Sequence, residues 1–136
     1  MKVVLDTNIL VSGLLQAFGP SGEIVRMVSS GELRLCYDAR ILCEYKEVLL
    51  RPKFSFNPTD VEDLLTQIKA GGLIVAGTPL NNHLPDPNDE PFLEVAFTGK
   101  ALYLITGNSK HYPLKKRQDT QVVSPQEFLD LYRRKR

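Results

Sequence analysis

The 136-residue sequence lacks tryptophan, has two cysteines and contains no long apolar run. Cys36 and Cys43 do not show metal-binding spacing, which favours a reduced protein with ordinary thiols. No segment reaches the roughly 20 apolar residues that a membrane-spanning helix needs. Asp6 and Asn8 also interrupt the apolar stretch near the N-terminus, where a secretory signal would need continuity. We therefore expect a soluble, cytoplasmic protein that is not associated with a membrane.

The sequence also lacks a strong excess of either charge, since its formal net charge is +1. Overall charge therefore predicts no general attraction to nucleic acid. Two local basic clusters stand out, at 115–117 and 133–136, and such clusters contact phosphate or simply face solvent. We consider Arg133, Arg134 and Arg136 candidate substrate-binding residues. The length suits one domain over residues 1–136, with a core that needs no disulfides.

Short apolar segments alternate with helical patterns along the chain. Strands are expected at 2–5, 33–36, 101–106 and 121–123, with 73–76 as a possible fifth. Helices are expected at 9–15, 22–29, 39–50, 59–70, 90–98 and 125–134, with Asp38 and Ser124-Pro125 marking two helix starts. This alternation predicts an α/β fold, a three-layer α/β/α sandwich around a largely parallel sheet. Residues 78–88, rich in proline, are expected to form a loop.

Polar residues follow two of the expected strands. Asp6 closes the first strand, and Asn108 lies just after the strand in "LYLITGN". Ligands of open α/β sheets bind at the carboxyl ends of the strands, so both residues are candidates for a binding site. Asp at a strand-to-helix turn is also a common helix cap, and that alternative stays open.

The expected helix at 39–50 carries an acid at the border of its buried face. Its apolar stripe consists of Ile41, Leu42, Tyr45, Val48 and Leu49. Helical periodicity turns Glu47 away from this stripe and puts Glu44 at its edge. Glu44 is therefore either a ligand or an ion-paired boundary residue.

A third acid stands at the start of the helix in "DPNDEPFLEVAF". Asp89 projects toward the face formed by Phe92, Leu93 and Ala96, whereas Glu90 and Glu94 are expected to point elsewhere. Two carboxylates about 4 Å apart repel by roughly 4 kcal/mol at an effective dielectric near 20, so convergence would require a cation or protonation. Carboxylate ligands favour Mg²⁺ or Mn²⁺ over zinc. The lone loop histidines, His83 and His111, are not expected to bind metal.

Five segments together resemble a PIN domain and, more narrowly, its VapC-like branch of toxins from toxin–antitoxin systems. They are "VVLDTNILVSGLL", "LCEYKEVLLRPKF", "DPNDEPFLEVAF", "LYLITGNSKHY" and "VVSPQEFL". The resemblance implies a parallel α/β/α fold with an acidic pocket for Mg²⁺ or Mn²⁺. It also implies nuclease activity on single-stranded RNA or on structured nucleic acid, in which the metal activates water and neutralises the leaving oxygen.

The resemblance assigns catalytic and metal-binding roles to Asp6, Glu44 and Asp89. The fourth family position, often Asp, falls on Asn108, whose amide oxygen can ligate a metal but brings no charge. Whether one or two metals bind is therefore left open. Further hydrogen bonds that orient the ligands are expected from Thr7, Asn8 and Ser109.

The leading functional hypothesis is a metal-dependent endoribonuclease that acts as a toxin and is restrained by an antitoxin protein. The alternatives are a stand-alone RNA- or DNA-processing nuclease and a catalytically weak module that binds RNA or protein. Asn108 favours the weak module, and the three acids oppose it. A phosphatase with a strand-end Asp nucleophile would want a second acid two residues on, where Asn8 stands. Self-association into a homodimer is left open.

Overall fold

The computed structural model describes residues 1–134 of the chain. Its strands are β1 (Lys2–Leu5), β2 (Arg34–Tyr37), β3 (Leu73–Ile74), β4 (Tyr103–Ile105) and β5 (Gln121–Val123). Its α-helices are α1 (Thr7–Leu15), α2 (Pro20–Ser29), α3 (Ala39–Leu49), α4 (Pro58–Gly71), α5 (Glu90–Thr98) and α6 (Pro125–Arg134). Short 3₁₀ turns are η1 (Pro52–Phe54), η2 (Pro87–Asp89), η3 (Ser109–His111) and η4 (Leu114–Lys116).

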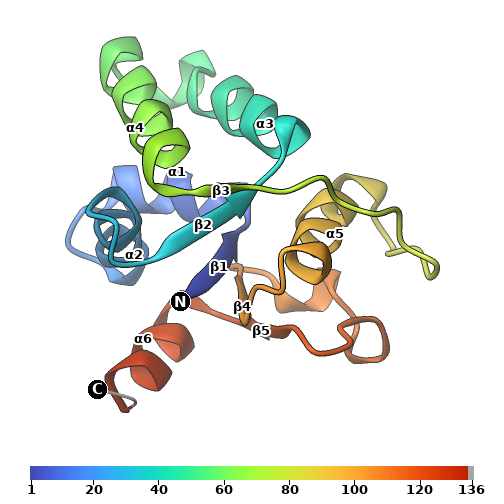
Figure 1. Cartoon of the computed structure of the whole chain (residues 1–136). Helices are drawn as coiled ribbons and strands as arrows, with labels where there is room; N and C mark the ends of the chain where they lie inside the picture. The colour runs from blue at the N-terminus through green and yellow to red at the C-terminus, as the bar shows by residue number, and fades with distance from the viewer. Residues whose placement is uncertain (135–136) are drawn as a thin grey trace.

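The strands form one sheet in the order β3-β2-β1-β4-β5, and every strand pair is parallel. The central strand β1 is covered on both faces, which explains why Val3, Val4 and Leu5 form a continuous apolar run and are fully buried. Figure 1 shows α5 on one side of the sheet and α1 to α4 on the other, while α6 packs against α2. The predicted α/β/α fold with a parallel sheet is therefore confirmed.

The element boundaries differ from the sequence-based expectation by a few residues. Helix α1 begins at Thr7, two residues before the expected start, because Asp6 keeps an extended backbone (ψ 147°) and the helix follows at once. Strand β4 is shorter than the expected 101–106, since Lys100 takes a left-handed conformation (φ 54°) just before it. The possible fifth strand exists but covers only Leu73–Ile74.

Three local features hold the helices that carry candidate residues. The side chain of Asp38 accepts a hydrogen bond from the Ile41 backbone N–H at 2.9 Å, so Asp38 caps α3 as predicted. The Tyr45 hydroxyl donates to the Leu5 carbonyl at 2.6 Å and ties α3 to the end of β1. Ser124 and Glu127 form a reciprocal capping box at the start of α6.

Within residues 1–134, no helix combines the length and the apolar character that crossing a bilayer requires. Both cysteines are free, with Cys36 buried in β2 and Cys43 exposed on α3.

Candidate active site

Asp6 lies at the carboxyl edge of the sheet, between the ends of β1 and β4. Its backbone N–H donates to the Ile105 carbonyl at 3.0 Å, which aligns the two strand ends. One carboxylate oxygen, Oδ2, accepts the Thr106 hydroxyl at 2.8 Å and the Tyr112 hydroxyl at 3.3 Å. Asp6 is only 8% exposed. Burial raises the pKa of Asp6, and the two hydroxyl bonds partly offset this effect.

Glu44 approaches the same edge from α3, where it is half-buried at the border of the apolar stripe, as predicted. The Thr7 hydroxyl donates to Glu44 Oε2, so the first residue of α1 orients this carboxylate. The buried Tyr45 lies beside both acids. Burial raises the pKa of its phenol well above the ordinary value, and the charges of Asp6 and Glu44 raise it further.

Asp89 ends η2 directly before α5, is 9% exposed, and does not cap the helix with its side chain. Its Oδ2 is buried without a hydrogen bond from any described residue. His111 Nδ1 lies 3.2 Å from this oxygen but outside hydrogen-bonding geometry, so the contact is electrostatic. Burial, followed by the charge of Asp6, raises the pKa of Asp89 to about 6. Asp89 is therefore a carboxylate whose charge is costly in the metal-free protein.

Asn108 and His111 contact each other beside the acidic residues. Asn108 Nδ2 lies 2.8 Å from His111 Nε2, and its backbone N–H donates to the Thr106 hydroxyl at 3.1 Å. The Asn108 side chain thus contacts the histidine, whereas its expected role as a metal ligand stays a prediction. Sequence reasoning dismissed His111, yet the fold brings it next to Asp89.

The three residues expected to orient the ligands differ in their contacts. Thr7 holds Glu44 as described above, and Asn8 Oδ1 accepts the Gly107 backbone N–H at 3.4 Å. Ser109 uses its backbone carbonyl, which accepts the Tyr112 backbone N–H at 3.0 Å. Sequence reasoning missed Thr106 and Tyr112. Only the position of Thr106 at the end of an apolar strand could have indicated its contact with Asp6.

A second charged group lies at the carboxyl end of β2. Arg40 pairs with Asp38 at 2.6 Å and with Glu94 at 2.9 Å. The expectation that Glu94 points away from the protein interior is wrong, because Glu94 is buried. Its face of α5 meets Arg40 from α3, and this ion pair satisfies the carboxylate where helical periodicity alone predicts solvent.

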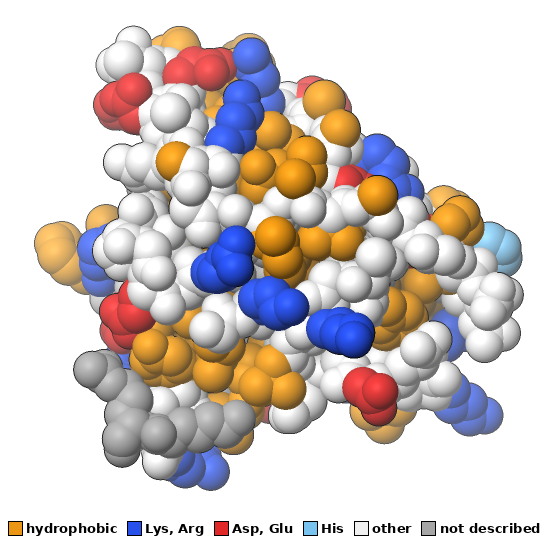
Figure 2. Space-filling model, in the orientation of Figure 1, with side chains coloured by type: hydrophobic (Ala, Val, Ile, Leu, Met, Phe, Trp, Pro, Cys, Tyr) orange, Lys and Arg blue, Asp and Glu red, His pale blue; other side chains and the backbone are white. Residues whose placement is uncertain are grey.

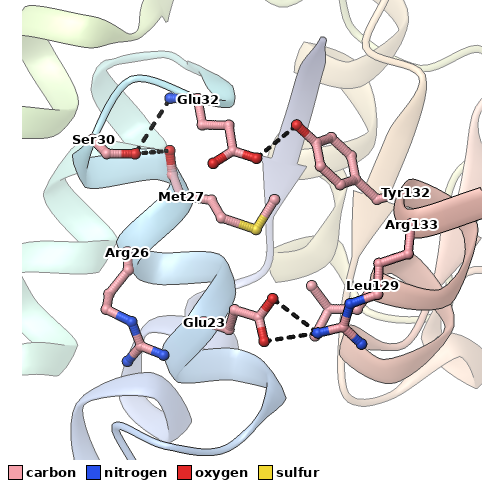
Figure 3. Close-up of a pocket in the computed structure, with 8 residues that line it drawn as sticks. All are labelled: Glu23, Arg26, Met27, Ser30, Glu32, Leu129, Tyr132 and Arg133. Carbon is pink, nitrogen blue, oxygen red and sulfur yellow. Dashed lines mark hydrogen bonds and ion pairs between the residues drawn. The ribbon is translucent and has the colours of Figure 1, made fainter. Parts of the chain in front are cut away.

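Arg133, close to the C-terminus, does not join the acids. Arg133 pairs with Glu23 of α2 at 2.9 Å, and the Tyr132 hydroxyl donates to Glu32 at 2.7 Å (Figure 3). Glu32 stands two residues before β2, so the end of α6 lies at the amino edge of the sheet. These contacts border a cavity of about 310 Å³ between α2 and α6. Arg134 is exposed on the same helix end. Arg136 lies outside the described residues.

The carboxylates fit a divalent cation that keeps much of its water. Among residues 1–134, no three His, Cys, Asp or Glu side chains form a ready-made metal-binding group. Mg²⁺ usually takes only one or two carboxylates together with waters and substrate phosphates. The buried Oδ2 of Asp89, which accepts no hydrogen bond from a described residue, supplies a hard oxygen donor beside the charge of Asp6. Asp6 and Asp89, with Glu44 next to them, therefore suit such an ion.

Comparisons with known proteins identify the family of the chain. A family model described as PIN domain matches residues 2–110. The chain belongs to the PIN-domain family, a family of nucleases. The uncharacterized protein MJ1680 of Methanocaldococcus jannaschii is 26% identical over 141 residues, which cover 96% of this chain and 90% of that protein.

The fold is also similar to a solved structure, VapBC2 from Rickettsia felis bound to a DNA fragment from its promoter. The TM-score is 0.60 at 15% identity, and the match covers 91% of this chain and 98% of that one. At this level of identity the similarity concerns the fold alone.

Proposed function

We propose that this protein is a metal-dependent endoribonuclease in which Asp6, Glu44 and Asp89 hold Mg²⁺ or Mn²⁺. The observation that supports this most directly is Asp89, a buried carboxylate with one oxygen that accepts no hydrogen bond from a described residue and with a pKa raised to about 6 beside Asp6. A divalent cation would relieve the repulsion between the two acids and favour their charged forms. The matching family model supplies the nuclease class.

Each side chain has a distinct task in this proposal. A bound ion would supply an activated water and neutralise charge on the leaving oxygen. Asp6 and Asp89 would hold that ion, and the hydroxyls of Thr106 and Tyr112 keep Asp6 in one orientation. Glu44, held by the Thr7 hydroxyl, is positioned to accept a proton or to orient a water.

We further propose that the protein acts as a cytoplasmic toxin with an antitoxin partner. The similar fold of VapBC2 and the sequence resemblance to the VapC-like branch support this partner, and RNA is the proposed substrate. Expression of the parent in a bacterial host should arrest growth, whereas Asp6→Asn should not. Growth arrest by both proteins would contradict toxicity through RNA cleavage.

A cleavage assay tests the proposed chemistry. Single-stranded RNA incubated with the parent should be cut with Mn²⁺ or Mg²⁺ and remain intact with chelator. Asp6→Asn, Glu44→Gln and Asp89→Asn should each lower the rate by at least about 100-fold, since each loses a charge that fixes the ion. Glu47→Gln, an exposed acid on the same helix as Glu44, is the matched control and should cut at the parent's rate.

The same assay separates the alternatives. Cleavage of DNA in preference to RNA would favour a DNA-processing nuclease. RNA binding without cleavage at any metal concentration would favour the binding module, which the contact between Asn108 and His111 supports. Full activity of Asp6→Asn would show that the assigned site is wrong.

A further inference from the structure

Basic side chains gather at the amino edge of the sheet, the edge opposite Asp6. Lys2 of β1 is paired in register with Arg34 of β2. On its other side, the Lys2 carbonyl accepts the Leu102 backbone N–H at 3.1 Å, and Lys100 stands two residues before Leu102. Neighbouring strands lie about 4.8 Å apart, so Arg34, Lys2 and Leu102 follow one another across the edge, and Lys100 extends this order two residues beyond Leu102. We call Arg34, Lys2 and Lys100 the amino-edge row.

The cations of the amino-edge row are not neutralised by neighbouring acids. Arg34 and Lys100 are exposed and Lys2 is half-buried. Among the described residues, no carboxylate lies within ion-pair distance of any of the three, whereas other exposed cations do form pairs, namely Lys46, Arg51 and Arg133. Figure 2 shows basic side chains in a line across the middle of the face it presents. Three unpaired cations in a row favour binding to a polyanion.

A hollow of about 400 Å³ adjoins the amino-edge row at Lys100. Phe97 and Leu102 give it apolar walls, and Gln118 adds an amide. Asp119 also lines the hollow, and its negative charge disfavours a phosphate inside it. An apolar hollow with hydrogen-bonding groups at its border suits a nucleobase, while the adjacent cations suit the phosphates that flank it.

We propose that the amino-edge row binds the phosphates of a single-stranded nucleic acid, with one base in the adjoining hollow. This surface lies on the other edge of the sheet from the candidate active site, so it is a second nucleic-acid contact and goes beyond the proposed cleavage. An acidic protein segment would also meet the cations. Its Asp and Glu side chains carry no flat ring next to the charge, whereas every nucleotide joins a base to its phosphate, which is why nucleic acid is the better fit.

Binding without cleavage tests this surface. The probe is a fluorescently labelled 12-nucleotide RNA, measured by anisotropy with chelator present and with increasing KCl. Without metal, the carboxylates at the other edge repel RNA, so the remaining binding reports on the amino edge. The triple variant Lys2→Gln/Arg34→Gln/Lys100→Gln should bind at least tenfold more weakly than the parent. Its slope of log K against log salt should fall by about 2, because each contact with a single strand contributes about 0.7.

The matched control carries the same charge change elsewhere, at exposed lysines of α3, η1 and α4: Lys46→Gln/Lys53→Gln/Lys69→Gln. It should keep the parent's slope and stay within threefold of the parent's affinity. If the triple variant melts below the assay temperature, the single variants Arg34→Gln and Lys100→Gln replace it, and each should lower the slope by about 0.7.

Two results would overturn the proposal. Equal slopes for the parent, the row variants and the control would show that the row does not contact phosphate. Polyglutamate that displaces the RNA as efficiently as unlabelled RNA of the same length would assign the row to an acidic protein partner instead. Weak displacement by polyglutamate, together with the reduced slope, supports nucleic acid.

Discussion

The two edges of the sheet carry opposite charges in very different surroundings. At the carboxyl edge, Asp6 and Asp89 are almost fully buried, and their pKa values are raised. At the amino edge, Arg34, Lys100 and Arg134 are exposed to solvent. Buried charges interact strongly and at short range, whereas exposed ones are screened by salt within about 10 Å. The carboxyl edge therefore suits chemistry and metal binding, and the amino edge suits contact with a flexible polyanion.

The difference arises from the connections that the parallel fold imposes. At the carboxyl edge, α1 and α5 begin beside the strand ends, and α3 packs against α1, so Thr7 can reach Glu44. At the amino edge the chain reaches β4 from α5 through Lys100, whose backbone is left-handed (φ 54°). A net charge of +1 therefore conceals a cluster of buried acids at one edge and a row of basic residues at the other.

The largest stability effect should come from Asp89. Its folded pKa of about 6 exceeds the ordinary value of 3.8, so the folded state binds this proton more tightly than the unfolded state. The contribution of this proton to the free energy of unfolding is therefore fully present below about pH 4. It is lost as pH rises through 6 and amounts to at most roughly 3 kcal/mol. Asp6, whose pKa is also raised, acts in the same direction.

Urea unfolding with chelator at pH 4 and pH 7.5 measures this effect. Asp89→Asn should gain stability relative to the parent as pH rises between these values, by up to roughly 3 kcal/mol. Asp63→Asn, an exposed acid on α4, is the control and should show little change in its difference from the parent. A pH-independent difference between the parent and Asp89→Asn would show that Asp89 is not electrostatically strained.

A matched pair of tyrosines compares the two edges directly. Tyr112 donates its hydroxyl to the buried Asp6, and Tyr132 donates to the exposed Glu32. Tyr112→Phe should lower the free energy of unfolding by about 1–2 kcal/mol, since Asp6 then loses a partner where water cannot easily replace it. Tyr132→Phe should cost less than about 0.5 kcal/mol, because water can solvate Glu32. Urea unfolding at pH 7.5 gives both values, and equal losses would contradict the assigned difference in burial.

The sequence predicts the order of strands and helices and the α/β/α fold well, and the reasons can be identified. The run Val3–Leu5 indicates a central parallel strand, and Asp38 indicates the start of α3. Strand ends, helical periodicity and the PIN resemblance predict the three site acids, Asp6, Glu44 and Asp89. The fold brings all three to the carboxyl edge. Their catalytic and metal-binding roles stay predictions.

Other parts of the site depend on contacts between distant segments. His111 and Tyr112 follow β4 in an irregular turn, whose path is held by the Arg117 Nε bond to the Tyr112 carbonyl at 2.6 Å. No periodicity describes such a turn. The burial of Glu94 depends on Arg40, which a different helix supplies. The amino-edge row likewise requires the strand order and register, which local patterns do not determine.

The position that departs from the family pattern provides a smaller test of the carboxyl edge. Asn108→Asp adds a negative charge beside the acids, so it should lower stability without metal and strengthen Mn²⁺ binding. Excess Mn²⁺ should raise its melting temperature by a few degrees more than the parent's, equivalent to about 1 kcal/mol. Asn82→Asp, in the exposed loop before η2, is the control. Equal metal-induced shifts for all three proteins would remove Asn108 from the site.

The smallest effect is expected from the ion pair between Arg133 and Glu23 at the amino edge. Both side chains are exposed by about half, 54% and 41%, so water and salt compete with their 2.9 Å contact. A double-mutant cycle with Arg133→Ala and Glu23→Ala should give a coupling of about 0.2–1 kcal/mol. The coupling should fall further in 1 M salt, where the screening length is about 3 Å. Urea unfolding of the four proteins at low and high salt provides the measurement. A coupling above about 2 kcal/mol that salt does not change would mean that this part of the amino edge is buried, and the contrast between the two edges would then fail there.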